Sequence, residues 1–167
     1  MKKAIQKIYI LGTSGSGKTF LANKLARELK IKPIDLDDIY WIKKYTKKRD
    51  KKIMKKRLKK LTKRKSWIIE GVYGSWIKEA IKKADLVIWL DPPFRILSWR
   101  IFMRYLKKRD STLKDTLNLI KYAGKYKKET YSASYKSHKA LLKEHKINFI
   151  SIKNKKQLNE FLKDFLK

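Results

Sequence analysis

This chain of 167 residues contains no cysteine, few acidic residues and no long apolar run. Without cysteine, the protein forms neither disulfide bonds nor thiolate metal sites. A membrane-spanning helix needs roughly 20 consecutive apolar residues, so no membrane span is expected. The N-terminus has lysines but no long apolar core, which argues against a secretory signal peptide. We therefore expect a cytoplasmic protein.

The composition is that of a globular protein. Hydrophobic residues make up 43% of the chain and aromatic residues 12%, which are values typical of folded proteins rather than disordered ones. The length corresponds to about one domain and suffices to bury a core. Because no repeat or flexible linker divides the sequence, we expect residues 1–167 to form a single domain.

Positive charge dominates the chain, which has 46 lysines and arginines against 15 acidic residues and a formal net charge of +31. One interpretation is a polyanionic partner such as nucleic acid, nucleotide or an acidic membrane. The other is a general compositional drift toward lysine, which the spread of lysine along the chain favours. Either way, we expect non-specific binding to nucleic acid at low salt. Arginine occurs at only eight positions and is therefore the more informative cation.

The most specific pattern is G-x-x-x-x-G-K-S/T at residues 12–19. A short apolar strand is predicted just before it, at residues 8–11, and an amphipathic helix just after it, at residues 20–29. Since strand, motif and helix agree, a phosphate-binding loop is favoured over an ordinary glycine-rich turn. The predicted nucleotide-binding residues are Gly12, Thr13, Ser14, Gly15, Ser16, Gly17, Lys18 and Thr19.

This loop predicts how ATP and Mg²⁺ are bound. Successive backbone amides form an anion nest, and the helix that follows contributes the positive end of its dipole. We expect Lys18 to reach the β- and γ-phosphates and the Thr19 hydroxyl to ligate Mg²⁺.

Short apolar runs alternate with helical segments along the chain. This alternation predicts an α/β fold with a parallel sheet that has helices on both faces. Ligands of such sheets bind beyond the carboxyl ends of the strands, so residues just after each strand are candidates for the site. The predicted strands are residues 8–11, 33–36, 67–70, 86–90 and 147–152.

Acidic residues follow the second and third predicted strands. Asp35, Asp37 and Asp38 stand at the end of the second; we favour Asp37 as the group that orients Mg²⁺ through water or accepts a proton from an attacking hydroxyl. The alternative is a helix N-cap. Glu70 ends the third strand and is a candidate to hold a metal-bound water near Thr19, with a solvent-exposed charge as the alternative.

The fourth strand ends at Asp91, which we expect to cap the next helix rather than bind a metal. That helix carries Arg100 and Arg104, which are four residues apart and so share one face. Two arginines on one face suit bidentate binding of phosphate oxygens, although a solvated basic face is the alternative. Arg109 follows close by.

Two further segments mix lysines with apolar or aromatic residues. Residues 43–65 are strongly basic, but an apolar face predicts one or two helices there; this face consists of Ile53, Met54, Leu58 and Leu61. Four tyrosines between 122 and 135 alternate with lysines, a pattern that fits single-stranded nucleic acid but more often an amphipathic helix. His138 and His145 have no clustered ligands beside them, so we interpret both as structural or surface residues.

With these features in place, the chain resembles the adenylate-kinase-related P-loop kinases, and among them the bacterial DNA topology modulation (FlaR-like) group. The phosphate loop is specific to the superfamily, and the other stretches narrow the resemblance to its kinase branch. The likeness covers most of residues 5–110. The matching stretches are residues 12–19, 35–41, 67–73 and 91–104.

The resemblance implies a three-layer P-loop NTPase fold of the adenylate- and shikimate-kinase type, with a five-stranded parallel sheet in the order 2-3-1-4-5. It implies that an insert at residues 38–65 holds the phosphate acceptor and that a basic region at about 105–130 forms a lid. Asp37 matches the family's second-strand aspartate, and Arg100 and Arg104 match the arginines that grip ATP and the transferring phosphate.

The function expected from these features is an ATP-dependent phosphotransferase that acts on a small-molecule acceptor, similar to nucleoside and nucleotide kinases. The alternative is a non-enzymatic, nucleotide-regulated nucleic-acid-binding protein. A GTPase is disfavoured, because no aspartate is followed by glycine three residues later.

Overall fold

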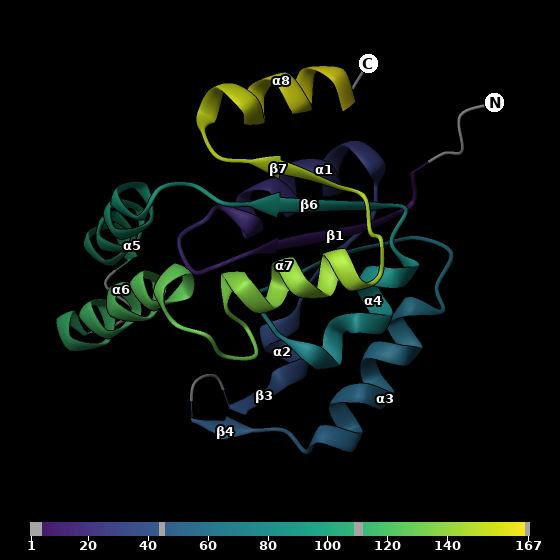
Figure 1. Cartoon of the computed structure of the whole chain (residues 1–167), viewed down its shortest axis with the longest axis horizontal. Helices are drawn as coiled ribbons and strands as arrows, with labels where there is room; N and C mark the ends of the chain where they lie inside the picture. The colour runs from purple at the N-terminus through teal and green to yellow at the C-terminus, as the bar shows by residue number, and fades with distance from the viewer. Residues whose placement is uncertain (1–4, 44–45, 109–111, 166–167) are drawn as a thin grey trace.

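The computed structural model describes residues 5–43, 46–108 and 112–165. At its centre is a five-stranded sheet whose neighbouring strands all run parallel, in the order β2-β5-β1-β6-β7 (Figure 1). This confirms the α/β fold expected from the sequence. Counting only the five strands of this sheet along the chain, it also confirms the order 2-3-1-4-5 that the family resemblance implies. The strands are β1 (Lys7–Gly12), β2 (Pro33–Asp35), β5 (Trp67–Gly71), β6 (Leu86–Leu90) and β7 (Phe149–Ile152).

Helices cover both faces of the sheet because the central strands are apolar on both sides. In β1, Ile8 and Ile10 pack on one face, while Tyr9 and Leu11 pack on the other, and all four are fully buried. On the first face lie α1 (Lys18–Leu29) and α8 (Lys155–Phe165). On the second face lie α2 (Leu36–Tyr40), α3 (Lys51–Thr62), α4 (Lys78–Lys83) and α7 (Tyr135–Glu144).

The segment after β2 differs in part from the prediction of one or two helices. Besides α3 it contains a short antiparallel hairpin, β3 (Trp41–Lys43) and β4 (Lys47–Lys48). The guanidinium group of Arg49 fastens this hairpin, since Nε donates to the carbonyl oxygen of Ile39 (2.9 Å) and Nη2 to that of Trp41 (2.9 Å). These two strands consist largely of lysine and show no alternation of apolar and polar residues, so they could not be predicted from the sequence.

Helix α3 packs through an apolar face, as expected, but the face is narrower than the sequence suggested. Met54 and Leu58 are buried in the core, and Leu61 is half-buried against it. Ile53 belongs to the predicted apolar face, but it is 48% exposed and lies on the side of α3 that is turned toward solvent.

The expected capping role of Asp91 is wrong. The next helix, α5 (Phe94–Lys108), begins three residues later, and the carbonyl oxygen of Pro93 accepts the amide of Leu97. Asp91 is buried instead, and its Oδ1 lies 2.7 Å from Nζ of Lys127 in α6 (Leu113–Lys128). A buried carboxylate needs such a partner, and this ion pair attaches α6 to the end of β6.

Helices α5 and α6 lie together beside the carboxyl ends of the strands (Figure 1). A single turn of 3₁₀-helix (Ser75–Ile77) leads into α4. Among the described helices, none combines the length and the apolar character that crossing a bilayer requires.

Candidate active site

The loop between β1 and α1 has the backbone geometry that its glycines allow. Gly15 and Gly17 adopt φ angles of 76° and 99°, values that favour glycine over other residues. A Cβ atom at Gly15 would lie 2.8 Å from the carbonyl oxygen of Leu97. Helix α5 therefore packs directly on the loop, and Gly17 forms the N-cap of α1.

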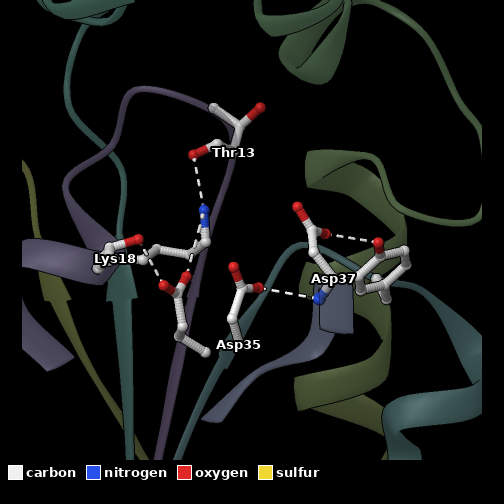
Figure 2. A network of polar contacts seen from close by, with 7 residues as sticks. Thr13, Lys18, Asp35 and Asp37 are labelled. Carbon is white, nitrogen blue, oxygen red and sulfur yellow. Dashed lines mark hydrogen bonds and ion pairs between the residues drawn. The ribbon is translucent and has the colours of Figure 1, made fainter. Parts of the chain in front are cut away.

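Three side chains of this region form a compact polar cluster (Figure 2). The Lys18 ammonium donates to the carbonyl oxygen of Thr13 (3.2 Å) and lies 3.9 Å from Oε2 of Glu70. The Thr19 hydroxyl donates to Oε1 of Glu70 (2.5 Å). Glu70 is only 3% exposed, so the alternative of a solvent-exposed charge at this position is wrong.

The loop also carries buried hydroxyl groups that suit a phosphate. Within the described part of the chain, neither Thr13 Oγ1 nor Ser16 Oγ has a hydrogen-bond partner, although both atoms are buried. Leaving such groups unpaired costs free energy, and phosphate oxygens are strong acceptors for them. The first amides of α1 lack intrahelical partners as well, so the loop fits a polyphosphate.

The donor set beside the loop also fits Mg²⁺. Mg²⁺ is bound through one or two protein oxygens together with phosphates and water, not by a full protein cage. Thr19 and Glu70 supply a hydroxyl and a carboxylate, while no cluster of three or more histidine, cysteine or acidic residues suited to a metal occurs in residues 5–43, 46–108 and 112–165.

Both arginines of α5 that the sequence singled out line the same cavity as the phosphate loop. Nη1 of Arg100 donates to the carbonyl oxygen of Ser16 (2.9 Å), so this arginine is already docked on the loop. Arg104 lies one turn further along. Arg109, which the sequence placed close to this pair, is outside the described residues.

The acidic residues at the end of β2 and in α2 have different roles. Asp35 is the N-cap of α2, and its Oδ1 accepts the amide of Asp37 (2.9 Å). Oδ1 of Asp37 accepts the hydroxyl of Tyr73 (2.6 Å). Figure 2 shows Lys18, Asp35 and Asp37 arranged along the end of the sheet, with Asp35 between the other two. Asp38 is exposed.

One cavity of about 930 Å³ joins these parts. The phosphate loop, Lys18 and Thr19 line one region of it, and Asp35, Asp37 and Glu70 line the edge of the sheet. Arg100 and Arg104 contribute from α5, and aromatic residues from five separate segments complete the wall. A cavity of this size has room for a small ligand, since ligand sites span roughly 300–1,000 Å³.

Sequence reasoning missed a buried chain of hydrogen bonds behind the aromatic wall. Trp89 Nε1 donates to the Tyr126 hydroxyl (3.2 Å), which lies 2.9 Å from Nδ1 of His138. Nε2 of His138 lies 3.0 Å from the carbonyl oxygen of Tyr73. Because that carbonyl only accepts, Nε2 carries the proton and Nδ1 accepts from Tyr126. Burial lowers the pKa of His138 to about 4, so the ring is neutral.

The tyrosines between 122 and 135 therefore face the protein interior. Tyr126 is buried, and Tyr122 and Tyr131 line the cavity with ring centroids 5.9 Å apart. The interpretation as an amphipathic helix holds for Tyr122 and Tyr126 on α6, whereas Tyr131 lies in the loop after α6 and Tyr135 begins α7. Neither the roles of these tyrosines nor that of His138 had a signal in the sequence, because their partners are distant along the chain.

A parallel sheet whose first strand leads through a phosphate loop into a helix defines a P-loop NTPase of the α/β class. Within this class, the chain belongs to the NB-ARC domain family, whose model matches residues 1–114. YqaC, an uncharacterized protein of Bacillus subtilis (strain 168), is 37% identical over 110 residues. That match covers 63% of this chain and 60% of YqaC, so the chain spans less than two thirds of this relative.

Solved structures with the same fold include small-molecule kinases. Shikimate kinase from Acinetobacter baumannii, in complex with shikimate, superposes with a TM-score of 0.56 at 19% identity and covers 98% of this chain and 97% of its own. A gluconokinase from Sinorhizobium meliloti 1021 has a TM-score of 0.55 at 11% identity, with 99% and 91% coverage. At these identities the likeness establishes the fold.

Proposed function

We propose that the protein transfers the γ-phosphoryl group of ATP to a hydroxyl group of a small molecule. The observation that carries this proposal is a single cavity that is lined by the phosphate loop, two arginines of α5 and Asp37. A site that only bound nucleotide would not need Asp37, whose carboxylate lines the part of the cavity away from the phosphate loop. The shared fold with shikimate kinase and gluconokinase supports the same conclusion.

The nucleotide half of the site uses the residues of the loop. Residues 12–19 surround the phosphates, with their amides and the unpaired hydroxyls of Thr13 and Ser16 as donors. The Lys18 ammonium exchanges its contacts with Thr13 and Glu70 for the β- and γ-phosphates. Arg100 and Arg104 stabilise negative charge on the transferring group, and a cation aimed there accelerates phosphoryl transfer by roughly 10³–10⁵.

The metal half of the site uses Thr19 and Glu70, which would hold Mg²⁺ directly or through water. When bound, Mg²⁺ neutralises charge that develops on the phosphates. The buried carboxylate of Glu70 keeps the Thr19 hydroxyl oriented toward this position.

Asp37 acts on the acceptor. The oxygen of the acceptor hydroxyl forms a bond to the γ-phosphorus, while the bond from that phosphorus to the β,γ-bridging oxygen breaks and its electron pair leaves with ADP. The hydroxyl proton passes to the carboxylate of Asp37, which acts as general base. Since the Tyr73 hydroxyl holds Oδ1, the other carboxylate oxygen is the one assigned to the proton.

The proposal also assigns a role to two segments of the chain. Residues 1–167 act as one kinase domain in which residues 38–65 bind the acceptor and about 105–130 form the lid. The resemblance to adenylate-kinase-related kinases and the FlaR-like group favours an enzyme similar to nucleoside or nucleotide kinases.

The decisive experiment measures ADP release with Mg²⁺ and ATP across a panel of hydroxyl compounds. Lys18→Ala should abolish turnover and leave the circular dichroism spectrum unchanged. Lys24→Ala, which changes an exposed lysine of the same helix, is the matched control and should be fully active. Normal ATP consumption by the Lys18→Ala variant would contradict the assignment of this site.

A further inference from the structure

The acceptor side of the cavity has an unusually aromatic wall. Its rings come from segments far apart in the sequence: the end of α2 and the start of β3, the loop and 3₁₀ turn after β5, helix α6 and the loop after it. Outside the phosphate loop and α5, the other polar side chains that line the cavity are the carboxylates together with Lys48, Lys51 and Ser132. Besides Phe20 of α1, the aromatic residues that line the cavity are Tyr40, Trp41, Tyr73, Trp76, Tyr122 and Tyr131.

Three of these rings pack against one another, and the planes of Tyr73 and Trp76 are tilted by 54° with centroids 5.3 Å apart. The centroids of Tyr40 and Tyr73 are 4.6 Å apart, with ring planes at 29°, and those of Tyr40 and Trp76 are 6.5 Å apart at 25°. Trp41 packs edge-on against Tyr40 at 4.8 Å. All of them are only partly buried and line the cavity, so part of each side chain is accessible to a ligand there.

The rings are held in place before any ligand arrives. The hydroxyl of Tyr73 is bonded to Asp37, and its carbonyl oxygen accepts Nε2–H of His138. A Cβ atom at Gly74 would overlap the carbonyl oxygen of Ser132, so the loop after β5 and the loop after α6 are in close contact. A wall fixed in this way binds a flat ligand with little loss of side-chain entropy.

The chemistry of this wall selects among hydroxyl compounds. A polyhydroxylated acceptor without an aromatic ring would need a polar partner for each buried hydroxyl, since unpaired ones cost binding energy. A flat aromatic ring instead stacks on aromatic side chains. Nζ of Lys48 lies 5.9 Å from the Tyr40 centroid and adds a cation to the stack.

We propose that the acceptor combines a hydroxyl group with a flat aromatic ring, as a nucleoside does, and that Tyr40 and Trp76 recognise this ring. The inference rests on the proposed function, because Asp37 must face the hydroxyl while the ring lies against the wall. Tyr40 and Trp76 determine specificity and take no part in the transfer of the phosphoryl group.

The test compares two groups of probes. The aromatic probes are thymidine, cytidine, adenosine and pyridoxine; shikimate and gluconate represent polyhydroxylated acids without an aromatic ring. ADP release is measured for each probe. Binding of each probe is measured separately by calorimetry with the non-hydrolysable analogue AMP-PNP and Mg²⁺ at saturation, so that the nucleotide region is filled.

We expect at least one aromatic probe to bind and to be phosphorylated. Tyr40→Leu and Trp76→Leu should each raise its dissociation constant and its KM about tenfold or more, while the KM for ATP stays unchanged. Tyr40→Phe retains the ring and should bind within about threefold of the parent protein, which separates loss of stacking from loss of folding. Trp99→Leu is the matched control, because Trp99 is 61% exposed on α5.

Each outcome decides one of the two proposals. Phosphorylation of the polyhydroxylated acids alone would overturn the aromatic acceptor and leave the kinase standing. Aromatic probes that bind in a Tyr40-dependent manner without any ADP release would support the acceptor class and count against the kinase. Binding that Tyr40→Leu and Trp76→Leu leave unchanged, or no aromatic binding at millimolar concentration, would overturn the inference.

Discussion

The hydroxyl group of Tyr73 donates a hydrogen bond of 2.6 Å to Oδ1 of Asp37. Tyr73 follows β5 and Asp37 lies in α2, so the bond joins two segments at the carboxyl edge of the sheet. Burial and the carboxylate of Asp37 raise the pKa of Tyr73 well above its usual value of 10.0. Tyr73 therefore remains a donor at every working pH and holds Asp37 in one orientation.

Removing this hydroxyl should slow turnover. Tyr73→Phe keeps the ring in the aromatic wall but frees the carboxylate to rotate, and we expect kcat to fall about 10- to 100-fold because misplacement of a catalytic group is costly. The KM for ATP should not change. Tyr105→Phe, which removes a hydroxyl from a partly buried tyrosine of α5, is the control. An unchanged kcat in Tyr73→Phe would show that Asp37 needs no such support.

The two arginines of α5 should have separable effects. Arg104→Ala should lower kcat by about 10³ and weaken ATP binding much less, because its charge acts mainly on the transferring phosphate. Arg100→Ala should lower kcat and also raise the KM for ATP, because the carbonyl oxygen of Ser16 loses its donor.

Steady-state kinetics with ATP varied at saturating acceptor measures both effects. Arg95→Ala, on an exposed position of the same helix, is the control and should behave as the parent. Equal losses of kcat and ATP affinity in Arg104→Ala would mean that this arginine contributes only to ground-state binding.

The neutral His138 predicts how stability depends on pH. Its pKa is lowered from 6.5 to about 4 by burial, so the folded state binds a proton less readily than the unfolded state. The free energy of unfolding therefore keeps its full value above pH 6.5. As the pH falls toward 4, protonation of His138 in the unfolded state lowers it by about 3 kcal/mol in total. Urea unfolding at pH 7, 6, 5 and 4 measures this loss.

A variant isolates the contribution of His138 from those of the carboxylates. His138→Gln keeps groups able to hydrogen-bond with Tyr73 and Tyr126 but does not titrate, so its stability should fall less between pH 6.5 and 4. The difference between the two pH profiles is the predicted quantity. Parallel profiles for the two proteins would contradict a neutral, buried His138.

The net charge predicts a salt-dependent affinity for DNA that is independent of sequence. Binding to a DNA duplex at low salt should weaken steeply as salt rises to about 0.15 M, because it depends on the release of counterions. Fluorescence anisotropy with two unrelated duplexes measures this. Tight, sequence-preferring binding at about 0.15 M salt, together with no ADP release for any acceptor, would favour the alternative of a nucleic-acid-binding protein.

Much of the architecture was predictable because its signals are local. The phosphate loop consists of eight consecutive residues, so the pattern by which it is recognised also contains all the residues that form it. The apolar strands beside it are predicted from the composition of four or five residues. The strand order came from the family resemblance and was confirmed. The catalytic and metal-binding roles given to Lys18, Asp37, Arg100, Arg104, Thr19 and Glu70 stay predictions.

By itself, then, the sequence determined the α/β class and the position of the phosphate loop, because both depend on neighbours along the chain. Only the tertiary structure decided that Asp91 pairs with Lys127 rather than capping α5, and that Tyr73 holds Asp37. The same is true of the contact between His138 and the carbonyl oxygen of Tyr73. These partners are tens of residues apart, and in a chain so rich in lysine and tyrosine no local pattern distinguishes the residues that meet from those that do not.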